Sequence, residues 1–155
     1  MKQQVPAVGS NAPDFTAAST SGESVTLSSY RGRNAVLLAF FPLAFTSTCT
    51  AELCDFNEEY DAFEATGVTL LPISVDSTAS LREYRAKYNM KTHLLSDFRR
   101  EISMAYGVLN DEKYYSNRAY FLIDRDGRIR WSHIEDVNKS KRTNAEILSQ
   151  IHLIV

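Results

Sequence analysis

The chain has 155 residues, of which 44% are hydrophobic, and this length suits one globular domain that buries about two thirds of its unfolded surface. Seventeen basic residues against 19 acidic ones give a net charge of −2, which offers no electrostatic reason to bind nucleic acid or an anionic membrane. The first residues contain no apolar signal region, so we expect a cytoplasmic protein formed as a single domain over residues 1–155. Two cysteines are too few for a secreted disulfide scaffold, and paired cysteines in a reducing compartment are usually catalytic or metal-binding.

The first half of the chain alternates strand and helix patterns. The run that Pro42 stops is continuously apolar, which is typical of a strand covered on both faces. In the next segment apolar side chains recur every three or four positions until Gly67, which indicates an amphipathic helix. In chain order, the predicted elements are a hairpin at 14–27, a strand at 34–41, a helix at 47–66, a strand at 68–75 and a helix at 77–90.

The second half adds an antiparallel pair and a final helix. The predicted elements are a short strand at 94–95, a helix near 100–106, strands at 119–123 and 128–134, and a helix at 143–153. Asp124–Gly127 has the composition of a tight turn between the two longer strands. Parallel strand–helix units followed by an antiparallel hairpin imply a mixed sheet between helices. We therefore predict a thioredoxin-like three-layer α/β sandwich with an N-terminal β-hairpin at its edge.

The segment from Phe41 to Cys49 joins the carboxyl end of a buried strand to the start of a helix. Ligands of open α/β sheets bind at that end of the strands. We expect Ser47 or Thr48 to cap the helix, which places Cys49 in the first turn, where unpaired N–H groups and the helix dipole favour a thiolate. Without further signals, a buried cysteine is as often inert filler as a reactive group.

Pro42, Thr46 and Cys49 form the pattern P-x-x-x-T-x-x-C, and this segment resembles the active-site loop of the peroxiredoxin family. The resemblance implies that Cys49 attacks a hydroperoxide, that Pro42 shields the sulfur from water, and that Thr46 with nearby backbone N–H groups binds the peroxide oxygens. These roles suit the chemistry, because displacement at an O–O bond needs a thiolate and preorganised donors where negative charge develops.

Two more positions match this family. A glutamate three residues after the cysteine corresponds to Glu52, and an arginine that opens a late strand corresponds to Arg118. The resemblance implies that Arg118 stabilises the thiolate and orients the peroxide, while Glu52 holds the guanidinium in a charge-assisted pair. Taken singly, Thr46 could be a cap, Glu52 a first-turn acid and Arg118 an exposed arginine. Their joint occurrence favours a peroxidase that needs no metal or organic cofactor.

The loop sequence and the position of the second cysteine match two different branches of the family. The loop from Phe40 to Thr46 looks most like the one-cysteine alkyl hydroperoxide reductase E branch, whereas Cys54 has the spacing of the resolving cysteine in the bacterioferritin comigratory protein (peroxiredoxin Q) branch. In an intact α-helix the Cα atoms of positions i and i+5 are roughly 8.6 Å apart, and a disulfide tolerates about 7 Å. A disulfide between Cys49 and Cys54 therefore requires local unwinding. Alternatively, Cys54 is a small residue on the helix flank and an external thiol resolves Cys49.

The resemblance also implies a hydroperoxide substrate, a thioredoxin-like or low-molecular-weight thiol reductant, and a monomer or homodimer. A thioredoxin-type disulfide exchanger shares the fold, but the chain has no C-x-x-C motif. A non-enzymatic, redox-sensing binding module is the alternative from a different class. No metal site is predicted, because two cysteines and three scattered histidines lack ligand spacing.

Overall fold

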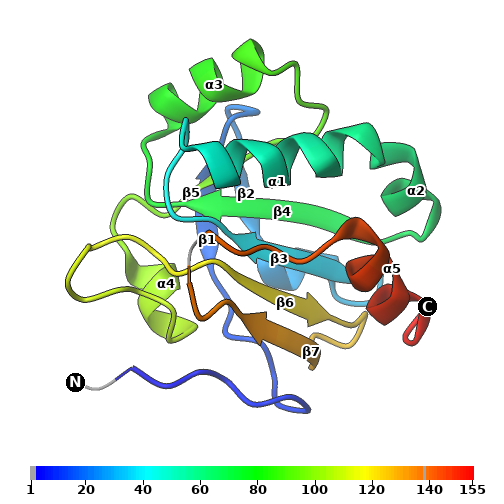
Figure 1. The fold of residues 1–155 in the computed structure, drawn as a ribbon. Coiled ribbons are helices and arrows are strands. Elements are labelled where there is room, and N and C mark those ends of the chain that lie inside the picture. The colour runs from blue at the N-terminus through cyan, green and yellow to red at the C-terminus, as the bar shows by residue number, and fades with distance from the viewer. Residues whose placement is uncertain (1–2, 138) are drawn as a thin grey trace.

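A computed structural model describes residues 3–137 and 139–155, and the order of its elements confirms the predicted series except in the segment 47–66 (Figure 1). In chain order the elements are β1 (Thr16–Ser19), β2 (Ser24–Thr26), η1 (Leu27–Tyr30), β3 (Val36–Phe40), α1 (Ser47–Glu58), α2 (Tyr60–Ala65), β4 (Thr69–Ser74), α3 (Thr78–Lys87), β5 (Leu95–Ser96), α4 (Glu101–Ala105), β6 (Ala119–Ile123), β7 (Ile129–Ile134) and α5 (Asn144–His152). None of the helices in the described ranges combines the length and apolar character that crossing a membrane takes.

All seven strands of the described residues form one sheet in the order β2-β1-β5-β4-β3-β6-β7. The interior strand β3 pairs in parallel with β4, the middle strand of the sheet, and antiparallel with β6. The β1–β2 hairpin lies at one edge and β7 at the other. The mixed sheet and the N-terminal edge hairpin are therefore as predicted, and the apolar run at 34–41 forms an interior strand that is covered on both faces, because every residue of β3 is buried.

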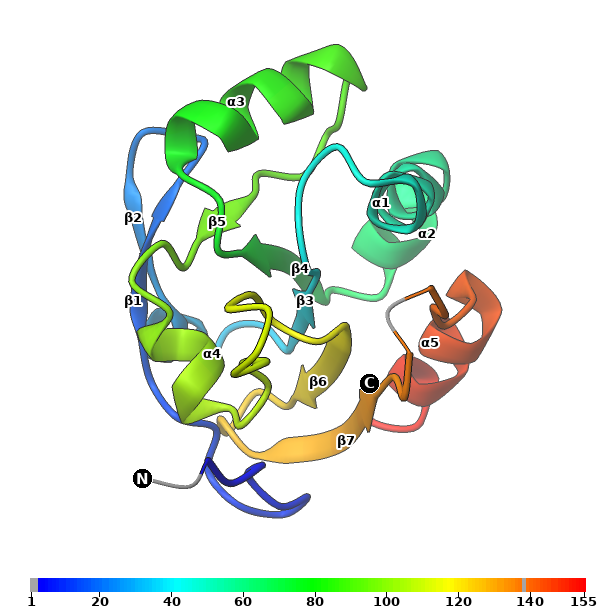
Figure 2. The same cartoon turned by 60° about the vertical axis from the view of Figure 1, so that its left-hand side comes forward.

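Two apolar cores separate the three layers, because side chains alternate between the faces of each strand. Helices α1, α2, α3 and α5 pack on one face of the sheet, with Phe56, Phe63, Leu81 and Ile147 among their buried residues. The other face packs against α4 and η1, which contribute Ile102 and Leu27. Figure 2 shows α4 on the side of the sheet opposite α1, α2 and α5. The three-layer, thioredoxin-like sandwich is thus confirmed.

The single helix predicted over residues 47–66 is wrong, because two helices occupy it. The first, α1, ends at Glu58, and α2 begins at Tyr60. At the break, the side-chain amide of Asn144 donates to the Asp55 carbonyl at 2.8 Å and to Glu59 Oε1 at 3.1 Å. The Asp55 carbonyl also accepts the Glu59 backbone N–H at 3.2 Å, so the amide of Asn144 adds to the helical bonds at the point where α1 ends.

Candidate active site

The loop between β3 and α1 is tied to the carboxyl end of β4. Asp76, just after β4, accepts hydrogen bonds from the Ala44 backbone N–H at 2.8 Å and from the Ser74 hydroxyl at 2.7 Å. Pro42 is buried at the start of this loop. Phe45, near its end, is exposed and has a left-handed backbone with φ 67°. The structure therefore places the loop at the strand ends where a ligand site was predicted.

The residue at the cap position of α1 is Thr46, so the prediction that Ser47 or Thr48 caps the helix is wrong. The Thr46 carbonyl accepts the first helical bond, from the Thr50 N–H at 2.9 Å. Its hydroxyl does not cap the helix but donates to the Leu43 carbonyl at 2.7 Å. A hydroxyl oxygen that donates its hydrogen in this way keeps its lone pairs as acceptors.

Cys49 lies in the first turn of α1, and its side chain is buried with only 1% of its surface exposed. The residue directly before β6, Arg118, donates from Nη2 to Cys49 Sγ at 3.1 Å. These two residues are 69 positions apart in the sequence, and the fold brings them into contact. The alternative that Arg118 is an exposed arginine is wrong, because 1% of it is exposed.

Glu52 completes a buried pair with the same guanidinium. Arg118 Nη1 lies 2.6 Å from Glu52 Oε1, and both side chains are 1% exposed. Burial raises the pKa of Glu52, and the nearby Arg118 charge opposes that increase. Burial lowers the pKa of Arg118, but Glu52 and Cys49 outweigh it and raise the pKa above its ordinary value. The guanidinium therefore stays charged beside the sulfur.

The structure adds Tyr120, which the sequence interpretation missed. The Tyr120 hydroxyl donates to Glu52 Oε2 and accepts from the Arg142 backbone N–H at 3.0 Å. The Arg142 side chain in turn pairs with buried Glu135, with Nε 2.7 Å from Oε1. One signal for Tyr120 was available, because it lies two residues after Arg118 and side chains at that spacing share a strand face.

Comparison with known proteins identifies the family of the chain. A family model described as the AhpC/TSA family matches residues 8–132. The chain belongs to this family of peroxiredoxins. Alkyl hydroperoxide reductase E from Mycobacterium tuberculosis is 39% identical to this peroxiredoxin over 130 residues, which cover 83% of this chain and 85% of the relative.

Solved structures show the same fold. The reduced 2-Cys peroxiredoxin of Plasmodium vivax is 35% identical, with a TM-score of 0.87 over 94% of this chain and 80% of that protein. Mycobacterium tuberculosis AhpC superposes with a TM-score of 0.86 over 96% of this chain and 93% of its own, at 24% identity. Family membership makes this chain a thiol-dependent peroxidase, so the interpretations as a disulfide exchanger and as a non-enzymatic module are not supported.

The second cysteine of this peroxiredoxin lies on α1 but is not bonded to the first. Cys54 is partly buried, and both cysteines are free thiols within one helix. Burial raises the pKa of the Cys54 thiol, and the neighbouring acids Glu58 and Asp55 raise it further. Cys54 is therefore held as the neutral thiol in this arrangement.

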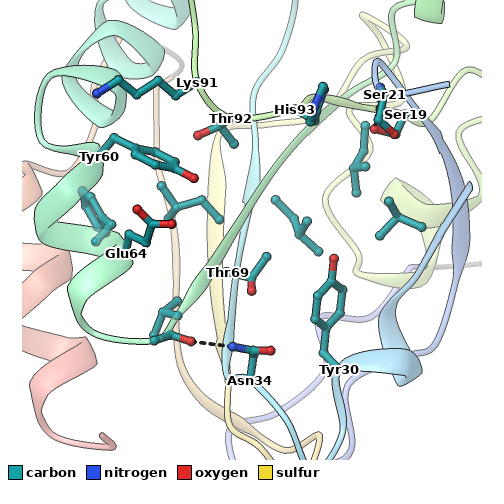
Figure 3. A pocket seen from close by; sticks show the side chains of 17 residues that line it. Ser19, Ser21, Tyr30, Asn34, Tyr60, Glu64, Thr69, Lys91, Thr92 and His93 are labelled. Carbon is teal, nitrogen blue, oxygen red and sulfur yellow. Dashed lines mark hydrogen bonds between the residues drawn. The ribbon is translucent and has the colours of Figure 1, made fainter. Parts of the chain in front are cut away.

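A cavity of about 380 Å³ lies away from Cys49. It opens between α2, the amino end of β4 and the edge hairpin, and the side chains of Tyr30, Tyr60, Glu64, Thr69 and Thr92 line it (Figure 3). Thr69 is the first residue of β4, whereas the loop that carries the predicted site is tied to the strand's last residue. This cavity is thus separate from the buried group around Cys49.

Proposed function

We propose that Cys49 is the nucleophile that reduces hydroperoxides, and the observation that carries this assignment is the contact of Arg118 with its sulfur. A guanidinium 3.1 Å from Sγ, in a site closed to bulk water, stabilises a thiolate more strongly than a solvated cation does. Because the Glu52 carboxylate holds the other terminal nitrogen of the guanidinium, Nη1, the cation is preorganised before a substrate binds.

In the first step the Cys49 thiolate attacks one oxygen of the hydroperoxide. An S–O bond forms as the O–O bond breaks, so the sulfur is oxidised to a sulfenic acid and the peroxide is reduced. The leaving hydroxide or alkoxide takes a proton and departs as water or an alcohol. Arg118 and the N–H groups of the first turn of α1 stabilise the charge that develops on this oxygen.

Two loop residues complete the proposed substrate site. The Thr46 hydroxyl oxygen, whose hydrogen is engaged by Leu43, is suited to accept the hydrogen of the hydroperoxide O–H group. Pro42 is buried in the same loop, and its ring has no N–H that would need a partner there. We assign it the role of excluding water from the sulfur.

In the second step, as we propose it, Cys54 resolves the sulfenic acid. The Cys54 sulfur attacks Cys49, an S–S bond forms and water leaves, and an external dithiol protein or two small thiols then reduce the disulfide and become oxidised themselves. The intact α1 keeps the Cα atoms of these residues too far apart, at roughly 8.6 Å for helical geometry, so the start of the helix must unwind.

A one-cysteine mechanism is the second candidate. It is favoured by the continuous α1, which holds both thiols unbonded, and by the similarity to alkyl hydroperoxide reductase E, the branch that the loop sequence resembles. In this case a thiol from outside the chain attacks the Cys49 sulfenic acid, and Cys54 is a structural residue.

The free-thiol count and mass after one equivalent of hydrogen peroxide test both candidates. Intramolecular resolution predicts that the wild type loses both thiols and about 2 Da, while Cys54→Ser retains a sulfenic acid that a dimedone probe traps. Sulfenic acid in both proteins establishes the one-cysteine mechanism. Cys49→Ser is the control, and equal peroxide consumption by this variant and the wild type would rule out Cys49 as the nucleophile.

A further inference from the structure

Tyr84 of α3 is bonded to the first turn of α1. Its side chain is fully buried, and its hydroxyl shares a hydrogen bond of 2.9 Å with Thr50 Oγ1. Thr50 directly follows Cys49, and its own backbone N–H makes the first helical bond, to Thr46. A side chain from another helix therefore fixes the turn that carries the sulfur.

The ring of the same tyrosine packs against the loop before α1. The centroids of the Tyr84 and Phe45 rings are 4.8 Å apart, and Phe41 lies at 6.3 Å. Phe45 has φ 67°, a conformation that a bulky residue keeps only where its surroundings hold it. Tyr84 thus contacts both segments that flank Cys49.

Burial also affects the ionisation of the Tyr84 hydroxyl. Burial raises the pKa of Tyr84, and the hydrogen bond with Thr50 opposes the increase. The hydroxyl therefore stays un-ionised in this position.

We infer that the Tyr84 hydroxyl is a positioning group that holds the first turn of α1 closed and so limits how fast Cys54 reaches the oxidised Cys49. This inference rests on the intramolecular resolution proposed above. Closing a gap of roughly 8.6 Å to the 7 Å of a disulfide takes the residues between the cysteines out of helical geometry. Thr50 is one of these residues, so its bond with Tyr84 breaks when the turn unwinds.

The rate of unwinding decides between two fates of the sulfenic acid. Attack by Cys54 gives the disulfide and water. Attack of the sulfenate on a second hydroperoxide breaks another O–O bond, adds a second oxygen to the sulfur and releases water or an alcohol, which leaves a sulfinic acid. Weakening the hydrogen bond between Tyr84 and Thr50 therefore yields more disulfide and less sulfinic acid at the same peroxide concentration.

Tyr84→Phe removes the hydroxyl and keeps the ring on Phe45. Since one hydrogen bond is worth a few multiples of thermal energy, we expect disulfide formation to accelerate about twofold to tenfold and the ratio of sulfinic acid to disulfide to fall by the same factor. The matched control is Tyr88→Phe, at the residue directly after α3, whose hydroxyl makes no hydrogen bond within the described ranges. It should behave as the wild type. Acid quenching at millisecond times followed by mass spectrometry measures both products.

Thr50→Val removes the other half of the bond and gives a test that does not depend on Tyr84→Phe folding normally. It should shift the ratio of products as Tyr84→Phe does, and the double variant should add nothing further. Unchanged ratios in both single variants, or fully additive effects, overturn the inference while leaving resolution by Cys54 intact. A wild type that forms no intramolecular disulfide overturns the resolution step and this inference with it.

Discussion

The Tyr120 hydroxyl donates to Oε2 of Glu52, the carboxylate oxygen that Arg118 leaves unused. Arg118 occupies Oε1 at 2.6 Å, so both oxygens of a fully buried carboxylate have partners. Buried charges are tolerated when they are paired and hydrogen-bonded in this way. The orientation of the guanidinium beside Cys49 therefore depends on a residue that does not touch the sulfur itself.

Tyr120→Phe should lower both stability and the rate of peroxide reduction. The variant leaves Glu52 Oε2 and the Arg142 N–H without their partner, which costs about 1–3 kcal/mol for a buried group. Denaturant unfolding measures the first effect and single-turnover oxidation of Cys49 the second. If both quantities match the wild type, Tyr120 does not position Glu52.

Glu52→Gln should destabilise the protein more than a surface substitution does. It keeps the side-chain volume but leaves the Arg118 cation buried without its carboxylate, and breaking a buried ion pair costs about 3–5 kcal/mol. Glu64→Gln, an exposed residue of α2, is the matched control and should change the free energy of unfolding by less than about 0.5 kcal/mol. Equal unfolding free energies for the two variants would contradict a structural role for the pair.

Arg118→Lys should slow the first step although it retains a positive charge. An ammonium group lacks the planar fork that contacts Cys49 and Glu52 together, so we expect single-turnover oxidation to fall about 10²- to 10³-fold. Arg99→Lys at an exposed position is the control, and a comparable loss there would refute the specific role of Arg118.

The condensation of Cys54 with the sulfenic acid should accelerate with pH. Burial, together with the charges of Glu58 and Asp55, holds the pKa of Cys54 above its ordinary value, and the thiolate is the attacking form. Well below that pKa, each unit of pH raises the thiolate fraction about tenfold, so the rate should climb steadily from pH 6 to 8. Glu58→Gln lowers the pKa and should increase the rate at a given pH. A rate that is flat over this range would mean that thiolate formation at Cys54 does not limit the step.

The order of helices and strands could be predicted because it depends on local patterns of apolar residues in the sequence. The apolar runs that became β3 and β4 and the helical spacing after Ser47 depend on neighbouring residues alone. The contact between Arg118 and Glu52 was expected only from the resemblance to a family, since 66 positions separate them and no local pattern connects them.

What the sequence could not show depends on distant partners. The break after Glu58 is associated with Asn144, which reaches α1 from the last helix. The Thr46 hydroxyl turns to Leu43 because of the backbone path of the loop, whereas its sequence position suited a cap. Tyr120 reads as an ordinary core aromatic until the register of β6 beside β3 places it under Glu52.

The packing around Tyr120 has a practical consequence. Trp131 of β7 is the only tryptophan in the chain, and its ring lies 6.2 Å from that of Tyr120, with His133 stacked at 6.4 Å. Its intrinsic fluorescence therefore originates at one place, a single side chain away from the carboxylate that holds Arg118. The tryptophan emission of the unlabelled protein, separated from that of its eight tyrosines by selective excitation, reports on this place, so the enzyme carries its own optical probe for following turnover in real time.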